Sequence, residues 1–269
     1  MLVAKSFDKL FSVRNKKILI TGSTGYFGQI ISEELLRRGA NIIINGRNEN
    51  KLLKLKKKLK QISNRFDVAN FDICDYKKVV FFSKKIKSLD VIINNAYDSN
   101  INFNSKNFET NLLNSKKSLE LNVIAVSNII SIFKNKMTKS NSKSMSSIIN
   151  IGSIYGTKSP DFKIYENKQF VNPDFYGAGK AALEQLTRYY AVSLAKNRIR
   201  VNSISPGAFP NLNALKKFTK FSKNLRKKIP LNRTGNPNDI IGSIIFLASD
   251  ASSYITGSNV KIDGGWSAW

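Results

Sequence analysis

The sequence contains no histidine and a single cysteine, Cys74, and both shortages restrict the chemistry that it can support. Without imidazole the chain cannot build a Ser-His-Asp or Cys-His nucleophilic site, or a zinc site that depends on histidine. One thiol excludes an intrachain disulfide and a thiolate metal cluster, and it suits a reducing compartment. Acid–base chemistry therefore has to use tyrosine, lysine, a carboxylate or Cys74, and no metal site is expected.

Long apolar runs are also missing. The longest, IIGSIIFLA at 240–248, is much shorter than the ~20 residues that cross a bilayer. The first 17 residues lack the apolar stretch and the small-residue cleavage site of a signal peptide. We therefore expect a cytoplasmic protein with no membrane partner.

Acidic residues are scarce, with 18 Asp and Glu against 44 Lys and Arg, for a net charge of +26. This excess invites a nucleic-acid interpretation. However, only 10 of the cations are arginine, whereas phosphate and base recognition favours arginine with interleaved aromatic residues. The densest run, KLLKLKKKLK at 51–60, keeps its leucines at helical spacing, as in a helix with one solvated face. No nucleic-acid partner is expected.

Short apolar strands alternate with helical patterns along the 269 residues. This order predicts an α/β fold: a single Rossmann-like, doubly wound domain with a mainly parallel sheet of about seven strands and helices on both faces. The strands are predicted at 16–21, 41–45, 65–71, 89–94, 146–151, 198–204 and 259–263. The helices are predicted from the glycine turn to 38 and at 48–61, 75–87, 114–137, 175–196 and 236–249. The domain is assigned to 16–269, after a short N-terminal leader at 1–15.

The first strand is followed by TGSTGYFG at 21–28, which is a strand–turn–helix context for binding a dinucleotide. Gly22 would allow the tight turn, Gly25 the approach of a pyrophosphate, and Gly28 close packing of the helix, whose N-terminus would face the anion. The candidate cofactor residues of this turn are Thr21, Gly22, Ser23, Thr24, Gly25, Tyr26, Phe27 and Gly28.

The second strand ends in NIIINGRN, without the acid that usually binds the ribose hydroxyls of NAD. Arg47 stands there instead, and a guanidinium suits a 2′-phosphate. The sequence therefore favours NADP(H), with NAD(H) as the weaker alternative. The competing interpretation is an ordinary surface arginine in a basic protein.

The stretch DFYGAGKAALEQLTRYY, residues 174–190, has the pattern of an amphipathic helix and carries Tyr176 and Lys180 on one face of its first turn. A phenol with an ordinary pKa near 10 is a poor acid–base catalyst at neutral pH, and a nearby ammonium favours the phenolate. This pair predicts a tyrosine general acid or base. The alternative is a plain first-turn pair, because Pro173 and Asp174 already mark the start of a helix.

Further motifs follow in a recognisable order: FDICD at 71–75, NNAY at 94–97, LELNVIAV around Asn122, INIGSIYG around Ser153, SPG at 205–207 and DGGW at 263–266. With the glycine turn and Tyr-x-x-x-Lys, this set resembles the short-chain dehydrogenase/reductase family from residue 16 to residue 266. The catalytic residues that the resemblance implies are Asn122, Ser153, Tyr176 and Lys180. The further cofactor residues that it implies are Asp72, Ile73, Asn94, Asn95, Ala96, Tyr176, Lys180, Pro206 and Gly207.

Two positions depart from the pattern of that family. Tyr26 stands where the ordinary branch has glycine, and the spacing of the glycines at 22, 25 and 28 is similar to that of the extended, sugar-nucleotide-modifying branch. Tyr97 replaces the glycine that usually ends Asn-Asn-Ala-Gly. A looser resemblance links the whole pattern to dehydrogenases of bacterial surface-glycan or flagellin-sugar biosynthesis.

The sequence thus predicts an NAD(P)(H)-dependent oxidoreductase that transfers hydride between nicotinamide and a carbonyl or secondary alcohol, with tyrosine as acid or base. Two alternatives stay open: a nucleotide-sugar epimerase or dehydratase, and a non-catalytic dinucleotide-sensing or nucleic-acid-binding protein. A substrate loop at 154–174 and a lysine-rich lid at 207–230 favour a polar or anionic small molecule, such as a sugar derivative, unless the lysines only reflect composition. The long helices 114–137 and 175–196 and the two tryptophans of the ending favour a homotetramer or homodimer.

Overall fold

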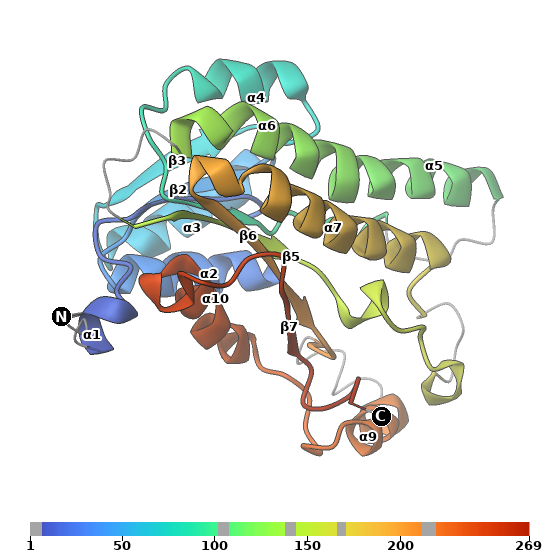
Figure 1. Ribbon diagram of the computed structural model, residues 1–269. Coiled ribbons are helices and arrows are strands. Elements are labelled where there is room, and N and C mark those ends of the chain that lie inside the picture. The colour runs from blue at the N-terminus through green and yellow to red at the C-terminus, as the bar shows by residue number, and fades with distance from the viewer. Residues whose placement is uncertain (1–6, 102–107, 138–143, 166–170, 211–218, 269) are drawn as a thin grey trace.

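The computed structural model describes residues 7–101, 108–137, 144–165, 171–210 and 219–268 (Figure 1). Its centre is a 7-stranded parallel sheet with the order β3-β2-β1-β4-β5-β6-β7, which confirms the predicted fold class. The sequence order reverses between β1 and β4, and such a switch point opens a crevice at the carboxyl ends of the strands. The strands are β1 Lys17–Ile20, β2 Asn41–Gly46, β3 Phe66–Asn70, β4 Val91–Asn94, β5 Ser146–Ile151, β6 Ile199–Pro206 and β7 Asn259–Ile262.

Helices cover both faces of the sheet. Figure 1 shows α4 to α7 on one side and α2 and α10 on the other. Alternate side chains of each strand enter different cores: Ile18 and Ile20 of β1 pack toward α2, whereas Leu19 packs toward α6. The central residues of β1, β2 and β4 are apolar on both faces for this reason. The helices are α1 Phe7–Leu10, α2 Tyr26–Arg37, α3 Glu49–Lys60, α4 Tyr76–Ser83, α5 Phe108–Leu119, α6 Ala125–Met137, α7 Asp174–Ser193, α9 Thr219–Lys228 and α10 Ile241–Ala248.

The helix expected at 114–137 is longer than predicted and is interrupted. It begins at Phe108, and a π-helical turn, Glu120–Ile124, separates α5 from α6. The turn contains no proline or glycine, so the pattern gave no sign of it. Such turns often occur at functional sites, and this one contains Asn122.

In the described ranges no helix is both long and apolar enough to cross a membrane.

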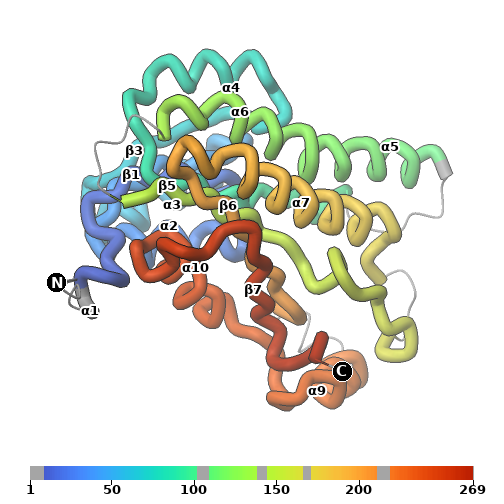
Figure 2. Tube along the Cα trace, viewed as in Figure 1, coloured from blue at the N-terminus to red at the C-terminus, as the bar shows by residue number. Residues whose placement is uncertain are grey.

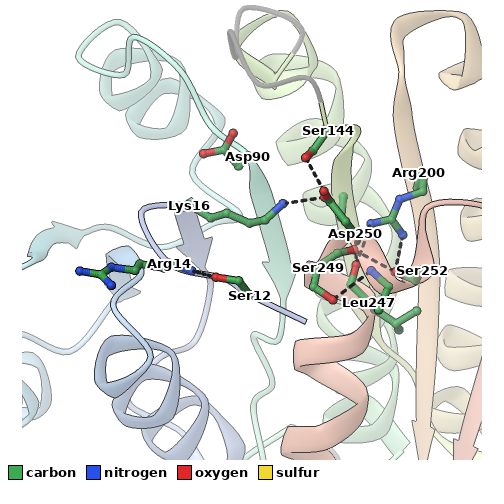
Figure 3. Close-up of polar contacts among 12 residues, drawn as sticks. Ser12, Arg14, Lys16, Asp90, Ser144, Arg200, Leu247, Ser249, Asp250 and Ser252 are labelled. Carbon is green, nitrogen blue, oxygen red and sulfur yellow. Dashed lines mark hydrogen bonds and ion pairs between the residues drawn. The ribbon is translucent and has the colours of Figure 1, made fainter. Parts of the chain in front are cut away.

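A buried arginine ties β6 to the end of α10 (Figure 3). Arg200 of β6 is buried, and its Nη2 donates to the backbone oxygens of Leu247 and Ser249 at 3.0 and 3.1 Å. Its Nη1 donates to Ser252 Oγ at 2.8 Å, and burial lowers the pKa of Arg200 to about 10. These bonds satisfy carbonyl groups at the end of α10 and hold it against β6.

The substrate loop and the lid contain more regular structure than expected. Short 3-10 turns, Ile154–Gly156 and Phe162–Ile164, lie in the loop, and α9 lies in the lid. A separate small core joins them, and Lys228 of α9 pairs with Asp161 of the loop at 3.0 Å. The members of this small core are Ile154, Ile164, Leu225, Ile229 and Trp266.

The ending of the chain differs from the prediction that its tryptophans lie at a subunit interface. Trp266 is buried within its own chain, packed in the small core beneath the lid. The indole is large enough to supply much of the apolar contact that this small cluster needs. Trp269 lies outside the described residues.

Candidate active site

The glycine turn forms a close-fitting cradle at the end of β1. Gly22 has a φ of 63°, and a Cβ there would lie 2.6 Å from Ala96 Cα. A Cβ on Gly28 would overlap the Gly22 carbonyl oxygen and approach Ser23 Cα to 2.7 Å. No side chain caps the N-terminus of α2, where Gly25 is the N-cap residue. This is the arrangement that a dinucleotide pyrophosphate requires, so the cradle fits the cofactor.

The end of β4 supports this turn. Thr21 Oγ1 accepts hydrogen bonds from the backbone nitrogens of Asn95 and Ala96 at 3.0 and 3.1 Å. The Asn95 amide donates to the carbonyl oxygens of Thr21 and Gly22, both at 3.0 Å. Asn94 instead donates to Asn150 Oδ1 at 2.8 Å, within the sheet. Of the two asparagines, Asn95 is thus the one that fixes the shape of the glycine turn.

Ser23 has a buried side chain that also belongs to the support of the turn. Its hydroxyl donates to the Ile20 carbonyl at 2.7 Å and accepts from the backbone nitrogen of Asn45 at 3.1 Å. The turn is therefore tied to β2 as well as to β4.

Arg47, predicted to face the adenosine end of the cofactor, lies between two carboxylates. Its Nη2 forms a short ion pair with Asp98, and its Nη1 lies 3.8 Å from an oxygen of Asp72. The hydrogen bond to Asp98 raises the pKa of Arg47. Ile73 is buried beside Asp72. The sequence predicted Arg47 and Asp72, but nothing in it linked Asp98 to Arg47 across 51 residues.

Three of the four predicted catalytic side chains meet at the carboxyl ends of β5 and β6. Ser153 is the N-cap residue of the 3-10 turn that follows β5, and its side chain hydrogen-bonds that of Tyr176. Lys180 is buried one turn further along α7, and its Nζ donates to the Ile151 carbonyl at 2.8 Å. The same Nζ lies 6.0 Å from the centre of the Tyr176 ring.

Asn122 reaches the same region from the π-helical turn. A Cβ on Gly179 would lie 3.5 Å from both Cβ and Nδ2 of Asn122, so the two helices touch beside Lys180. The Asn122 amide nitrogen donates to the Ser118 carbonyl at 2.8 Å. The π-helical turn therefore packs against α7 at Gly179, next to Lys180.

Burial dominates the electrostatics of the pair. It raises the pKa of Tyr176, against the lowering effect of the hydrogen bond from Ser153. Burial also lowers the pKa of Lys180 to about 8. The expected net lowering of the tyrosine pKa is therefore not found, because desolvation outweighs the other contributions to Tyr176. Neutral Tyr176 is the form that can give a proton to a developing alkoxide.

The low pKa of Lys180 predicts a measurable pH dependence of stability. An unfolded lysine has a pKa of about 10.4, so between pH 8 and 10.4 the unfolded chain binds the proton that folded Lys180 has lost. This contribution to the free energy of unfolding therefore rises with pH across that window, by on the order of 1–3 kcal/mol. Urea unfolding at pH 8 and pH 10 should show it as a steeper rise for the wild type than for Lys180→Met. An equal change of the unfolding free energy with pH in the two proteins would contradict the low pKa of Lys180.

Two tyrosines that the sequence did not assign to the site flank Tyr176. The rings of Tyr97 and Tyr155 lie edge-to-face with it, at centroid distances of 6.0 and 6.5 Å. The Tyr155 hydroxyl is 3.0 Å from that of Tyr165 in the substrate loop. Tyr97 was visible only as a departure from the family pattern, and Tyr155 only as part of the motif around Ser153. The site is therefore walled by aromatic rings that also carry hydroxyl groups.

The segment after β6 connects the lid to the glycine turn. The Gly207 backbone nitrogen donates to the Ile262 carbonyl at 2.9 Å, directly after Pro206. Phe209 packs edge-to-face on Phe27 at 5.2 Å, and the Tyr26 hydroxyl donates to the Pro210 carbonyl at 3.4 Å. The lid lysines 216 and 217 lie outside the described residues.

Known proteins match this chain over nearly its whole length. Residues 26–267 match the family model described as Enoyl-(Acyl carrier protein) reductase, one of the short-chain dehydrogenase models. The 3-oxoacyl-[acyl-carrier-protein] reductase FabG of Rickettsia conorii is 30% identical, with 95% of this chain and 98% of the relative covered. The 5-keto-D-gluconate 5-reductase of Escherichia coli K12 is 30% identical, with 96% and 98% covered.

A solved structure agrees in fold. The gluconate 5-dehydrogenase of Burkholderia cenocepacia, in complex with NADP and tartrate, is 26% identical and superposes with a TM-score of 0.80 over 97% of this chain and 98% of that one. The chain belongs to the short-chain dehydrogenase/reductase family. It is an NAD(P)-dependent oxidoreductase of that family, acting between carbonyl and alcohol groups.

Proposed function

We propose that the protein is an NADP(H)-dependent oxidoreductase that interconverts a ketone and a secondary alcohol on a small polar compound, with Asn122, Ser153, Tyr176 and Lys180 as its catalytic residues. The observation that supports this most strongly is the position of buried Lys180, whose Nζ lies 6.0 Å from the centre of the Tyr176 ring and donates to the Ile151 carbonyl at the carboxyl end of β5, two residues before Ser153. The glycine turn lies at the same edge of the sheet. Hydride donor and proton donor would therefore meet over one crevice.

Each side chain has a role that follows from its position. The nicotinamide, when bound, supplies or accepts the hydride. The Tyr176 hydroxyl gives its proton to the carbonyl oxygen during reduction and takes it back during oxidation. Ser153 donates a hydrogen bond to the same oxygen and stabilises the negative charge that develops there. Lys180 holds the nicotinamide ribose and returns a proton toward Tyr176, and Asn122 binds a water that links Lys180 to solvent.

The cofactor assignment rests on Arg47 and on the lack of an acid at the end of β2, whose last residues are Asn45 and Gly46. A guanidinium at this place binds a 2′-phosphate, so NADP(H) is preferred and NAD(H) is the weaker cofactor. The solved relative described above holds NADP. The cradle around Gly22 and Gly28 would hold the pyrophosphate of either cofactor.

The substrate assignment is a small, polar and anionic compound derived from a sugar. The tyrosine walls of the site carry hydroxyl groups that can hydrogen-bond a polyol, and the lid helix beside them is strongly cationic. A fatty-acyl substrate would require an apolar lid instead. A sugar acid, as in the name of the 5-keto-D-gluconate reductase, combines both features. The cations of α9 are Lys220, Lys223, Arg226, Lys227 and Lys228.

Turnover of anionic and neutral ketones separates this proposal from its rivals. We expect kcat/KM with NADPH to be higher for 5-keto-D-gluconate than for a neutral keto sugar of the same length, and the advantage to shrink as salt rises. A Lys223→Gln, Lys227→Gln variant should lose part of the advantage. Faster reduction of an acetoacetyl thioester, with no dependence on salt, would favour an acyl substrate and overturn the assignment.

We propose that two copies associate through α5 and α7, as expected from the family resemblance. These helices lie side by side (Figures 1 and 2), and their outer faces expose large apolar side chains that include Leu113 and Val192, which is 80% exposed. Burying such side chains between two copies removes them from water. In sedimentation at micromolar concentration we expect a dimer or tetramer, and a Val192→Glu variant should shift toward monomer. A wild type that sediments only as monomer would refute this.

The proposed location is the cytoplasm, where the lone Cys74 would stay reduced.

A further inference from the structure

The ion pair between Arg47 and Asp98 crosses the cofactor crevice. Arg47 directly follows β2, and Asp98 lies four residues after the last residue of β4. Because β1 lies between these two strands, the pair passes over the carboxyl end of β1, where the glycine turn begins. Ala96, two residues before Asp98, contacts Gly22. The side chains of this pair therefore lie where the adenosine half of the cofactor would enter.

Arg47 is not a free cation at this place. It faces two carboxylates, so Arg47, Asp72 and Asp98 together carry a formal charge of +1 − 2 = −1. The Asp98 side chain is only 11% exposed, and its Oδ1 also accepts from the backbone nitrogen of Asn100 at 3.0 Å. The guanidinium, whose side chain is 56% exposed, is the mobile partner of a fixed carboxylate.

We propose that Asp98 is the residue that limits the preference for NADP(H), by competing with the 2′-phosphate for Arg47. This inference rests on the proposed use of NADP(H). A 2′-phosphate has to take Arg47 away from Asp98 and has to approach a buried like charge, and both effects weaken its binding. NAD(H), with a 2′-hydroxyl at that position, has neither cost. Asp98 therefore lets the enzyme use both cofactors.

The same geometry predicts that the two carboxylates differ in how strongly they weaken the binding of NADPH. Asp98 makes the short, hydrogen-bonded contact with Arg47, whereas the Asp72 oxygen is 3.8 Å away and its side chain is 40% exposed. Removing the charge of Asp98 should therefore strengthen the binding of the 2′-phosphate of NADPH more than removing the charge of Asp72. The affinity for NADH should be nearly unchanged in the Asp98 variant, because NADH does not need Arg47.

Equilibrium binding tests the proposal without any substrate. Dissociation constants for NADPH and NADH would be measured by calorimetry for the wild type, Asp98→Asn, Asp98→Glu, Asp72→Asn and Arg47→Ala. The control is Asp67→Asn, which makes the same charge change on an exposed residue of β3. We expect Asp98→Asn to bind NADPH about tenfold more tightly, with NADH changed by less than about twofold. Asp72→Asn should shift in the same direction by less, and Asp98→Glu and Asp67→Asn should keep the wild-type ratio.

The outcomes test the role of Asp98 separately from the NADP(H) preference on which it rests. If Arg47→Ala weakens NADPH alone and Asp98→Asn leaves the NADPH to NADH ratio within about twofold of the wild type, the role of Asp98 is wrong and the NADP(H) assignment stands. Weaker NADPH binding in Asp98→Asn would also overturn the inference, since Asp98 would then orient Arg47 for the phosphate. If the wild type binds NADH as tightly as NADPH and Arg47→Ala changes neither, the NADP(H) assignment itself fails. Asp72→Asn serves as the second test if Asp98→Asn does not fold.

Discussion

Replacing Tyr176 by phenylalanine is expected to lower kcat by roughly 10²–10⁴-fold while the affinity for NADPH stays within about twofold of the wild type. The variant keeps the ring that packs against Tyr97 and Tyr155 and loses only the hydroxyl that hydrogen-bonds Ser153. Because a proton moves only in the chemical step, kcat and kcat/KM should fall together. Steady-state rates and NADPH binding by calorimetry would measure the two quantities separately.

The matched control is Tyr254→Phe, which removes the same atom from a fully exposed side chain. Its rate and its thermal stability should equal those of the wild type. If Tyr176→Phe keeps more than a tenth of the wild-type turnover, the proton donor is another group, and the hydroxyl of the adjacent Tyr155 would be examined next.

Gly28→Ala is expected to abolish most cofactor binding. The added Cβ would overlap the Gly22 carbonyl oxygen and lie 2.7 Å from Ser23 Cα, both of them backbone atoms of the glycine turn. Overpacking of this kind costs about 1–3 kcal/mol of folding stability. The start of α2 would have to move away from the turn, and a cost of about 3 kcal/mol to the bound arrangement corresponds to about a hundredfold in affinity. We therefore expect NADPH binding to weaken by about a hundredfold.

Gly242→Ala supplies the control, since a Cβ there would meet no atom within 4 Å. Gly242 lies in α10, where alanine is favoured over glycine by up to about 1 kcal/mol, so this variant should be as stable as the wild type or slightly more so. Chemical denaturation and NADPH titration of the two variants would be compared. Unchanged affinity in Gly28→Ala would show that the turn does not hold the pyrophosphate as proposed.

The fold was predictable because its strands are short, several of them are apolar on both faces, and clear helical patterns separate them. Alternation of Ile18, Leu19 and Ile20 between the two cores gives β1 a continuous apolar sequence, which is typical of a strand buried in a parallel sheet. The sequence did not predict the π-helical turn around Asn122, because its residues, ELNVI, include no glycine or proline that would mark an interruption of the helix. It also did not predict α9, in which Phe221 and Leu225 are the only large apolar residues.

The candidate site was predictable where a motif lies within one segment. The glycine turn, Ser153 and the Tyr176–Lys180 pair each combine a local pattern with a defined position at the end of a strand or the start of a helix. Contacts between distant segments were not predictable, and Asp98 with Arg47 is the clearest example. The electrostatic effect of burial was also missed, because the desolvation of Tyr176 and Lys180 depends on the packed interior and not on their spacing.

Transfer of the cofactor hydride to a ketone tests the account most directly. The protein would be incubated with NADPH deuterated at the transferring position of the nicotinamide and with 5-keto-D-gluconate, and the alcohol product would be analysed by mass spectrometry. We expect one deuterium on the former carbonyl carbon, formed at least a hundredfold more slowly by Tyr176→Phe. Deuterium transfer that is undiminished in Tyr176→Phe, or no transfer to this ketone, to a neutral keto sugar or to an acetoacetyl thioester, would contradict it.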